Sequence, residues 1–152
     1  MRTKSELAAA VAAGLGRESF EHSEEGIFDI TALREIAPKV GVRLTVGLWQ
    51  ILPHLATSRE VCMNRVRELP EASWRNDPAI FLVFTNGDEE THLMVDGHHR
   101  AQRRHLEGLE DLPAYFVPAT LAPRPPPGWG RRADLDWGEK EMVNGKLVPR
   151  GK

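Results

Sequence analysis

The feature that most restricts the fold is a continuous apolar run at residues 79–84, with a turn signal on each side. An Asp-Pro pair at 77–78 precedes the run and an Asn-Gly pair at 86–87 follows it. A run without polar alternation is typical of a strand that is covered on both faces, so this segment predicts a central strand. Asn-Gly is a strong hairpin signal, and residues 91–95 are expected to return antiparallel beside the run.

Period-two alternation predicts a half-buried strand at residues 42–46, with Val42, Leu44 and Val46 on the buried face. A short helical turn is expected at 48–52, ending at Pro53. A last strand is predicted near residues 114–117.

Four helices are expected along the chain. The first is capped at Ser5 and the second at Thr31, the second ending at residues 38–41. A third, capped by Ser58, places Cys62 on its apolar face as a small buried hydrophobe. The fourth runs from His98 to residue 107, with a glycine after its end.

These elements predict an α+β fold, a small mixed sheet with flanking helices, within 152 residues of which 41% are hydrophobic and 28% charged. We expect an N-terminal helical extension at 1–41 packed on the core, the core at 42–118, and a proline-rich spacer with a polar tail at 119–152. In the tail, Trp129 and Trp137 are candidate apolar anchors for a partner protein; the alternative is that the tail is partly disordered or packs on its own domain.

Charge and cysteine content exclude several classes of protein. The formal net charge of −2 gives no overall field for a polyanion, so any contact with nucleic acid must be local. A single cysteine excludes an internal disulfide and a cysteine-built zinc site, and it favours a reducing compartment. The apolar run at 7–15 is too short for a membrane span, so we expect a cytoplasmic protein without a membrane partner.

The stretch Val95-Asp-Gly-His-His-Arg100 carries the chemistry, because it joins a strand to a helix. Gly97 permits a sharp turn with positive φ, and the first amides of the new helix point outward to form an anion site. The imidazoles of His98 and His99 can donate hydrogen bonds, and Arg100 can form a bidentate pair with phosphate.

Neighbouring charged residues extend this hypothesis. Asp96 is a candidate ligand for Mg²⁺ or acceptor of a hydroxyl proton. Arg103 or Arg104, one turn along the helix, can reach further phosphates. The alternative is that Asp96 caps the helix and the arginines form a solvated face. His105 is expected on the buried side as a core histidine, and the histidine spacing does not favour a zinc site.

The stretch from residues 42 to 117 resembles the ParB and sulfiredoxin-like superfamily. The most specific part is Asp96-Gly-His-His-Arg100 before a helix, with Leu-Pro-Ala at 112–114 opening the last strand. The resemblance implies that Gly97, His99 and Arg100 contact nucleotide phosphates. Sulfiredoxin has a cysteine where His98 stands, and Cys62 lies far along the chain, so sulfinic acid reduction is not expected.

The motif is most similar to the Asp-Gly-Xaa-His-Arg sequence of free serine kinases. Those kinases place a catalytic glutamate after the first strand in a Pro-Xaa-Glu context. Here Pro53 is followed by His54, and the nearest carboxylate is Glu60, next to Arg59, so this pair is expected to border the site.

Three functional hypotheses follow from these residues and this resemblance. The first is a domain that binds a nucleoside triphosphate with Mg²⁺ or another phosphate ligand, with phosphoryl transfer or hydrolysis as the reaction. In that reaction Asp96, His98, His99 and Glu60 are the candidate catalytic groups. The candidate phosphate-binding residues are Gly97, His98, His99, Arg100, Arg104 and Arg59. The second is a DNA-associated accessory protein or ParB-like nuclease. The third is a scaffold that docks a protein partner through its tail.

Overall fold

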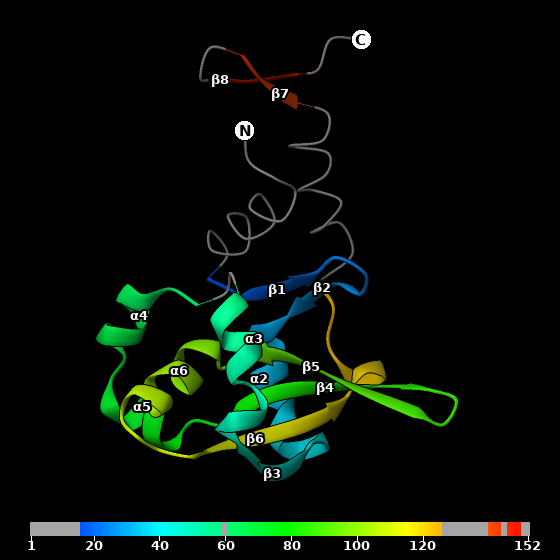
Figure 1. Cartoon of the computed structure of the whole chain (residues 1–152). Helices are drawn as coiled ribbons and strands as arrows, with labels where there is room; N and C mark the ends of the chain where they lie inside the picture. Colours follow the sequence, from blue (N-terminus) through cyan, green and yellow to red (C-terminus); the bar gives the residue numbers. More distant parts are fainter. Residues whose placement is uncertain (1–15, 59–60, 126–139, 144–145, 150–152) are drawn as a thin grey trace. The chain divides into compact units, whose positions relative to one another are not determined.

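The computed structural model describes residues 16–58, 61–125, 140–143 and 146–149 and has a mixed α+β fold (Figure 1). The chain divides into two compact units, one made of Arg34–Ala122 and the other of Met1–Leu33 with Pro123–Lys152. The expected core at 42–118 lies wholly within the Arg34–Ala122 unit. The α+β class predicted from the sequence is confirmed.

A four-stranded mixed sheet forms the centre of the Arg34–Ala122 unit. In spatial order, its strands are β3 (Val42–Gly47), β6 (Asp111–Pro118), β4 (Ala79–Asn86) and β5 (Glu89–Asp96). The β4–β6 pair is parallel, whereas β3–β6 and β4–β5 are antiparallel. The predicted central strand, the hairpin and the last strand are confirmed.

The hairpin turn lies one residue later than its sequence signal. Asn86 still pairs with Glu89, so Gly87 and Asp88 form the turn itself, and Gly87 has a positive φ of 64°. A glycine adopts this conformation without a steric penalty. The position of the glycine therefore determines where the chain reverses.

Helical segments connect and flank the strands of this unit. They are η1 (Leu48–Gln50), α3 (Leu52–Thr57), α4 (Met63–Glu68), α5 (Glu71–Asn76), α6 (His98–Leu106) and η2 (Ala119–Leu121). The prediction that Pro53 ends a helical turn is wrong, since Pro53 lies in the first turn of α3. A first-turn position suits proline because the N–H that it lacks would have no intrahelical partner there.

The predicted helix around Cys62 is shorter than expected. Cys62 precedes α4 as its N-cap residue, no side chain caps that helix, and the cysteine is exposed. The prediction of Cys62 as a buried residue, with Ser58 as the helix cap, is therefore wrong. The apolar spacing was correct for Val66, which is fully buried, but it was extended too far toward the N-terminus.

Alternate residues of the strands form two different faces of the sheet. One, here called the α6 face, carries Phe81, Met94 and Ala114, which pack with Ala101 of α6 in one cluster of buried residues. The other, the α2 face, carries Ile80 and Val117. Side chains of consecutive strand residues point to opposite faces, so each face makes its own contacts.

Strand β3 departs from its predicted burial. Val46 is buried, but Val42 is 60% and Leu44 is 50% exposed. These residues pair with Phe116 and Ala114 and share the α6 face. The period-two pattern identified that face correctly, but η1, α3 and α6 leave its β3 edge uncovered.

Helix α2 (Ile30–Val40) contributes its last seven residues, from Arg34 onward, to the same unit. Ala37 is buried, and Gly41 after the helix lies so close to Val117 that an added Cβ would be 3.1 Å from its Cγ2 atom. The helix contains Pro38 and ends at Val40, within residues 38–41 where we expected its end.

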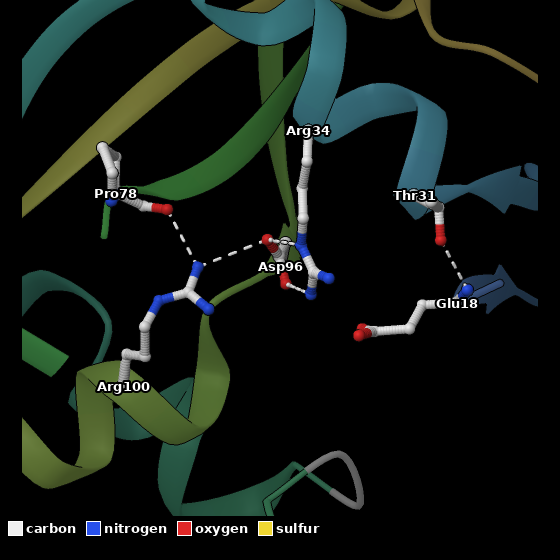
Figure 2. Close-up of polar contacts among 6 residues, drawn as sticks. All are labelled: Glu18, Thr31, Arg34, Pro78, Asp96 and Arg100. Atoms are coloured by element: carbon white, nitrogen blue, oxygen red, sulfur yellow. Dashed lines mark hydrogen bonds and ion pairs between the residues drawn. The ribbon is translucent and has the colours of Figure 1, made fainter. Parts of the chain in front are cut away.

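The other unit contains the hairpin β1 (Ser19–His22) and β2 (Gly26–Asp29) and the strand pair β7 (Lys140–Val143) and β8 (Lys146–Pro149). The sequence reasoning predicted neither pair. Asp29, not Thr31, caps α2, because its Oδ1 accepts a hydrogen bond from the Ala32 amide. Thr31 instead accepts a hydrogen bond from the Glu18 amide through Oγ1 (Figure 2).

Several predictions lie outside the described residues. These are the first helix at 5–15, the pair Arg59 and Glu60, and the tryptophans Trp129 and Trp137. Among the helices that the structure describes, none is both long and apolar enough to cross a membrane.

Candidate functional site

The turn between β5 and α6 is built on Gly97, which has a φ of 101° in the left-handed region. A Cβ atom at this position would lie 2.7 Å from the Ala79 Cβ, closer than two carbon atoms can approach without a shift. Both the conformation and the close approach require glycine. The expected sharp turn is confirmed, and it brings the start of α6 against the start of β4.

A β-bulge determines the direction of Asp96. Phe81 pairs with Met94, but the preceding residue Ile80 pairs with Asp96, which leaves Val95 as an extra residue in β5. In a regular ladder Asp96 would share the face of Met94; the bulge turns it to the face of Ile80 instead. The carboxylate therefore lies on the α2 face.

On the α2 face, Asp96 is held by two arginines (Figure 2). Arg34 of α2 donates from Nε and Nη2 at 2.9 and 2.8 Å, one bond to each carboxylate oxygen, and Arg100 donates at 3.3 Å. Burial alone would raise the pKa of the Asp96 carboxyl. The bonds and charges of the two arginines outweigh burial, so this pKa lies below its ordinary value of 3.8.

Arg100 is turned inward. Its Nη2 donates to the Pro78 carbonyl at 2.9 Å as well as to Asp96, and its side chain is 13% exposed. Its Nε is buried and has no hydrogen-bond partner among the described residues. In this arrangement Arg100 fastens α6 to β4 and β5, so the expected bidentate contact with phosphate would require its guanidinium to leave these partners.

His98, the first residue of α6, is 5% exposed, and its Nε2 lies 3.1 Å from Nε2 of His54 in α3. Burial, and after it the neighbouring His54, lower the pKa of His98 from 6.5 to about 4. His98 is therefore neutral at neutral pH. Sequence reasoning placed the core histidine at His105, which is exposed, whereas His98 is the buried one.

His99 faces the segment before α4. Its Nε2 accepts a hydrogen bond of 3.0 Å from the Cys62 amide, so a neutral His99 carries its proton on Nδ1. The expectation that Cys62 lies far from the motif holds along the chain but not in space. The contact joins the loop around Cys62 to the N-terminus of α6.

Arg103 and Arg104 bind the ends of two short helices. Arg103 Nη1 donates to the carbonyls of Val66 and Arg67 at the end of α4. Arg104 Nη1 donates to the carbonyls of Trp74 and Arg75 near the end of α5, and its Nε donates to the main-chain carbonyl of Asp111. Carbonyls in the last turn of a helix lack intrahelical donors, so both guanidinium groups stabilise helix ends.

A hollow of about 790 Å³ opens over the uncovered part of the α6 face. Its floor includes Phe81 and Phe116, whose rings stack at 4.9 Å. Leu44 of β3 and Trp49 of η1 contribute to the wall, and so does His54, the residue bonded to His98. The hollow and the N-terminus of α6 are thus adjacent.

Asp96 was the candidate Mg²⁺ ligand. The described residues contain no group of three or more His, Cys, Asp or Glu side chains placed to hold a metal ion. Both Asp96 oxygens accept bonds from guanidinium groups. A metal ion there would have to displace an arginine. Glu60 lies outside the described residues.

The structure therefore brings together Asp96, His98, His99 and Arg100 around the Gly97 turn. It adds two residues that the motif alone did not predict, Arg34 and His54. Arg34 lies 62 positions from Asp96, and no local signal marks it. His54 follows Pro53 where the kinase pattern places a catalytic segment, and that placement was a usable signal.

Comparison with known proteins gives no relative. No family model, curated protein or solved structure matches the chain.

Proposed function

We propose that this protein binds the phosphate group of a nucleotide, or of another phosphate ligand, at the N-terminus of α6. The observation that carries the proposal is that, among the described residues, no side chain caps this terminus and its first turn holds no acidic residue, and that it follows a left-handed glycine. The first amides of a helix and the positive end of its dipole favour an anion.

The charges around His98 support an anion over a cation. His54 opposes a positive charge on His98 more strongly than Asp96 favours one, and His99 and Arg100 oppose it as well. A bound phosphate would lower the cost of positive charge at this end of the helix. The His99 imidazole and the amides of the first turn of α6 are the groups that we assign to the phosphate.

Asp96 has a positioning role in this proposal. By holding Arg34 and Arg100 it fixes the turn against α2 and β4. With a nucleoside triphosphate as the ligand, Mg²⁺ would be held by the phosphates as their counter-ion, and Asp96, whose oxygens accept bonds from Arg34 and Arg100, would not be its ligand. Phosphoryl transfer or hydrolysis is the reaction class of such a ligand, and the groups nearest to it are His54, His98 and His99.

The DNA-binding alternative loses two of its contacts in this geometry. It places Arg103, Arg104 and the basic tail along a phosphate backbone, but both arginines bind main-chain carbonyls of α4 and α5, and most of the tail lies outside the described residues. Salt dependence still separates the two functions. Binding to a DNA backbone weakens with a log-log slope of roughly −0.9 per phosphate neutralised, whereas a single nucleotide gives a shallower dependence.

The test is calorimetric titration with CTP, ATP, GTP and their diphosphates in the presence of Mg²⁺. His99→Glu places a carboxylate at the second position of α6, where it suits the helix dipole and competes with phosphate for the same amides. His105→Glu is the matched control, since it adds the same charge at the exposed, opposite end of the helix.

We expect saturable binding that His99→Glu abolishes and His105→Glu retains. Equal loss in both variants would show that overall charge, not the α6 terminus, controls binding. Absence of binding to the wild-type protein by every nucleotide, and by inorganic triphosphate, would refute the proposal.

A further inference from the structure

The hollow on the α6 face is lined mainly by apolar and aromatic side chains, and it is separate from the amides assigned to phosphate. We propose that it binds a flat, uncharged aromatic ring. The inference deepens the proposed function, because the ring and the phosphate would belong to one ligand. Only this link between ring and phosphate rests on the proposed function.

The size and chemistry of the hollow fit such a group. Its volume of about 790 Å³ lies within the range of roughly 300–1,000 Å³ usual for small-molecule sites. No Asp, Glu, Lys or Arg belongs to its lining. A cationic group placed there would lose water without gaining a carboxylate partner from the lining, which is unfavourable, whereas an uncharged ring loses little.

Aromatic side chains supply both the floor and the rim. Phe81 and Phe116 stack with an interplanar angle of 7°, and His92 meets Phe116 edge-on, with the ring centroids 5.1 Å apart. At the rim, Trp49 is 73% exposed. Aromatic pairs add stabilisation of about 0.5–1.5 kcal/mol beyond the area that they bury, so an entering ring has several partners.

Trp49 lies close to the strand backbone at Gly47. A Cβ atom on Gly47 would lie 2.7 Å from the indole Nε1, so the exposed indole packs against the glycine. Thr45, Gln50 and His54 add hydrogen-bonding groups to an otherwise apolar wall. A few polar groups in an apolar site fix the orientation of a bound ring.

His54 gives the inferred ring a direction. It lines the hollow and lies 3.1 Å from His98 at the start of α6. A ligand with its ring in the hollow would therefore extend past His54 toward the α6 amides. This order of groups, an aromatic ring followed by phosphate, is that of a nucleotide.

The test is NMR on the full chain with uncharged probes, namely adenosine, cytidine, quinoline and indole at millimolar concentration. Methyl signals of Leu44, Ile51 and Met94 report on the hollow, and those of Leu82, which is buried and outside the lining, serve as a control. We expect at least one probe to shift the hollow signals in a saturable way while Leu82 stays unchanged. Shifts of none of the hollow signals by any probe would overturn the inference.

Two variants on the same strand sharpen the test. Leu44→Glu puts a carboxylate in the wall, and Val42→Glu puts one two residues away on the same face, at a similarly exposed position outside the lining. We expect Leu44→Glu to weaken probe binding about tenfold or more, and Val42→Glu to leave it near the wild-type value. Equal effects would refute the hollow as the site.

A separate titration with inorganic triphosphate distinguishes this inference from the proposed function. It is followed by the backbone amide signals of His98, His99 and Arg100. Probe binding without a triphosphate response would refute the phosphate site and keep the ring site. A triphosphate response without probe binding would refute the ring site and keep the phosphate site.

Discussion

The buried His98 makes the stability of this fold depend on pH in a defined window. Its pKa is about 4 in the folded protein and 6.5 ordinarily. Between these two values the unfolded chain binds a proton at this residue and the folded chain does not. The free energy of unfolding therefore falls as the pH decreases from about 6.5 to about 4, and the loss from this residue is complete below that range.

The size of the effect follows from the pKa difference. A lowering from 6.5 to about 4 corresponds to about 3 kcal/mol, at about 1.36 kcal/mol for each pKa unit. Such a loss is a large fraction of the roughly 5–15 kcal/mol that stabilises most domains. It should be visible in urea unfolding curves at pH 7, 5.5 and 4.

His98→Gln isolates this contribution. The substitution removes the titrating imidazole, so the difference in unfolding free energy between wild type and variant should shrink by about 3 kcal/mol between pH 7 and pH 4. His105→Gln, at the exposed end of the same helix, controls for the loss of an imidazole as such. If the wild-type and His98→Gln profiles ran parallel across this range, the argument from burial would be wrong.

Three other substitutions have expected outcomes. Asp96→Asn should cost about 3 kcal/mol of stability at pH 7 by leaving Arg34 and Arg100 without a carboxylate. Because the pKa of Asp96 is lowered, the difference in unfolding free energy between wild type and this variant, measured by urea titration, should become smaller below pH 3.8. Gly97→Ala should lower the thermal midpoint through backbone strain of about 1–2 kcal/mol plus the contact with Ala79. A second change, Ala79→Gly, should restore only the part that comes from the Ala79 Cβ, because the new Cβ also lies 2.9 Å from the Ala79 Cα. Arg104→Gln should lower stability by about 1–3 kcal/mol in calorimetry, and a DNA salt series with an unchanged slope would separate this role from phosphate binding.

The parts of the fold that the sequence predicted depend on local signals. The central strand, its hairpin and the Gly97 turn are marked by apolar runs and by glycines whose positive φ is needed where they occur. Gly108, also with a positive φ, marks the end of α6 as expected. These signals act within a few residues, so they can be read without knowledge of the tertiary structure.

The remaining features depend on contacts between distant segments. The partners of Asp96 and His98 are Arg34 and His54, which lie 62 and 44 positions away, and no periodicity connects them. The exposure of Leu44 depends on how much of the sheet α6 covers, which is a property of packing. The arginines of α6 illustrate the same limit, because a charge run looks alike whether it meets solvent, phosphate or carbonyls.

The two arginine contacts of α6 have a consequence for how the domain opens. Helices α4 and α5 have six residues each, too few for an isolated helix to persist in water. Each is fastened at its C-terminal end by one guanidinium of α6. Opening of α6 would release both, so the amides of α4, α5 and α6 should exchange hydrogen as one cooperative unit, and whatever binds at the start of α6 would protect all three.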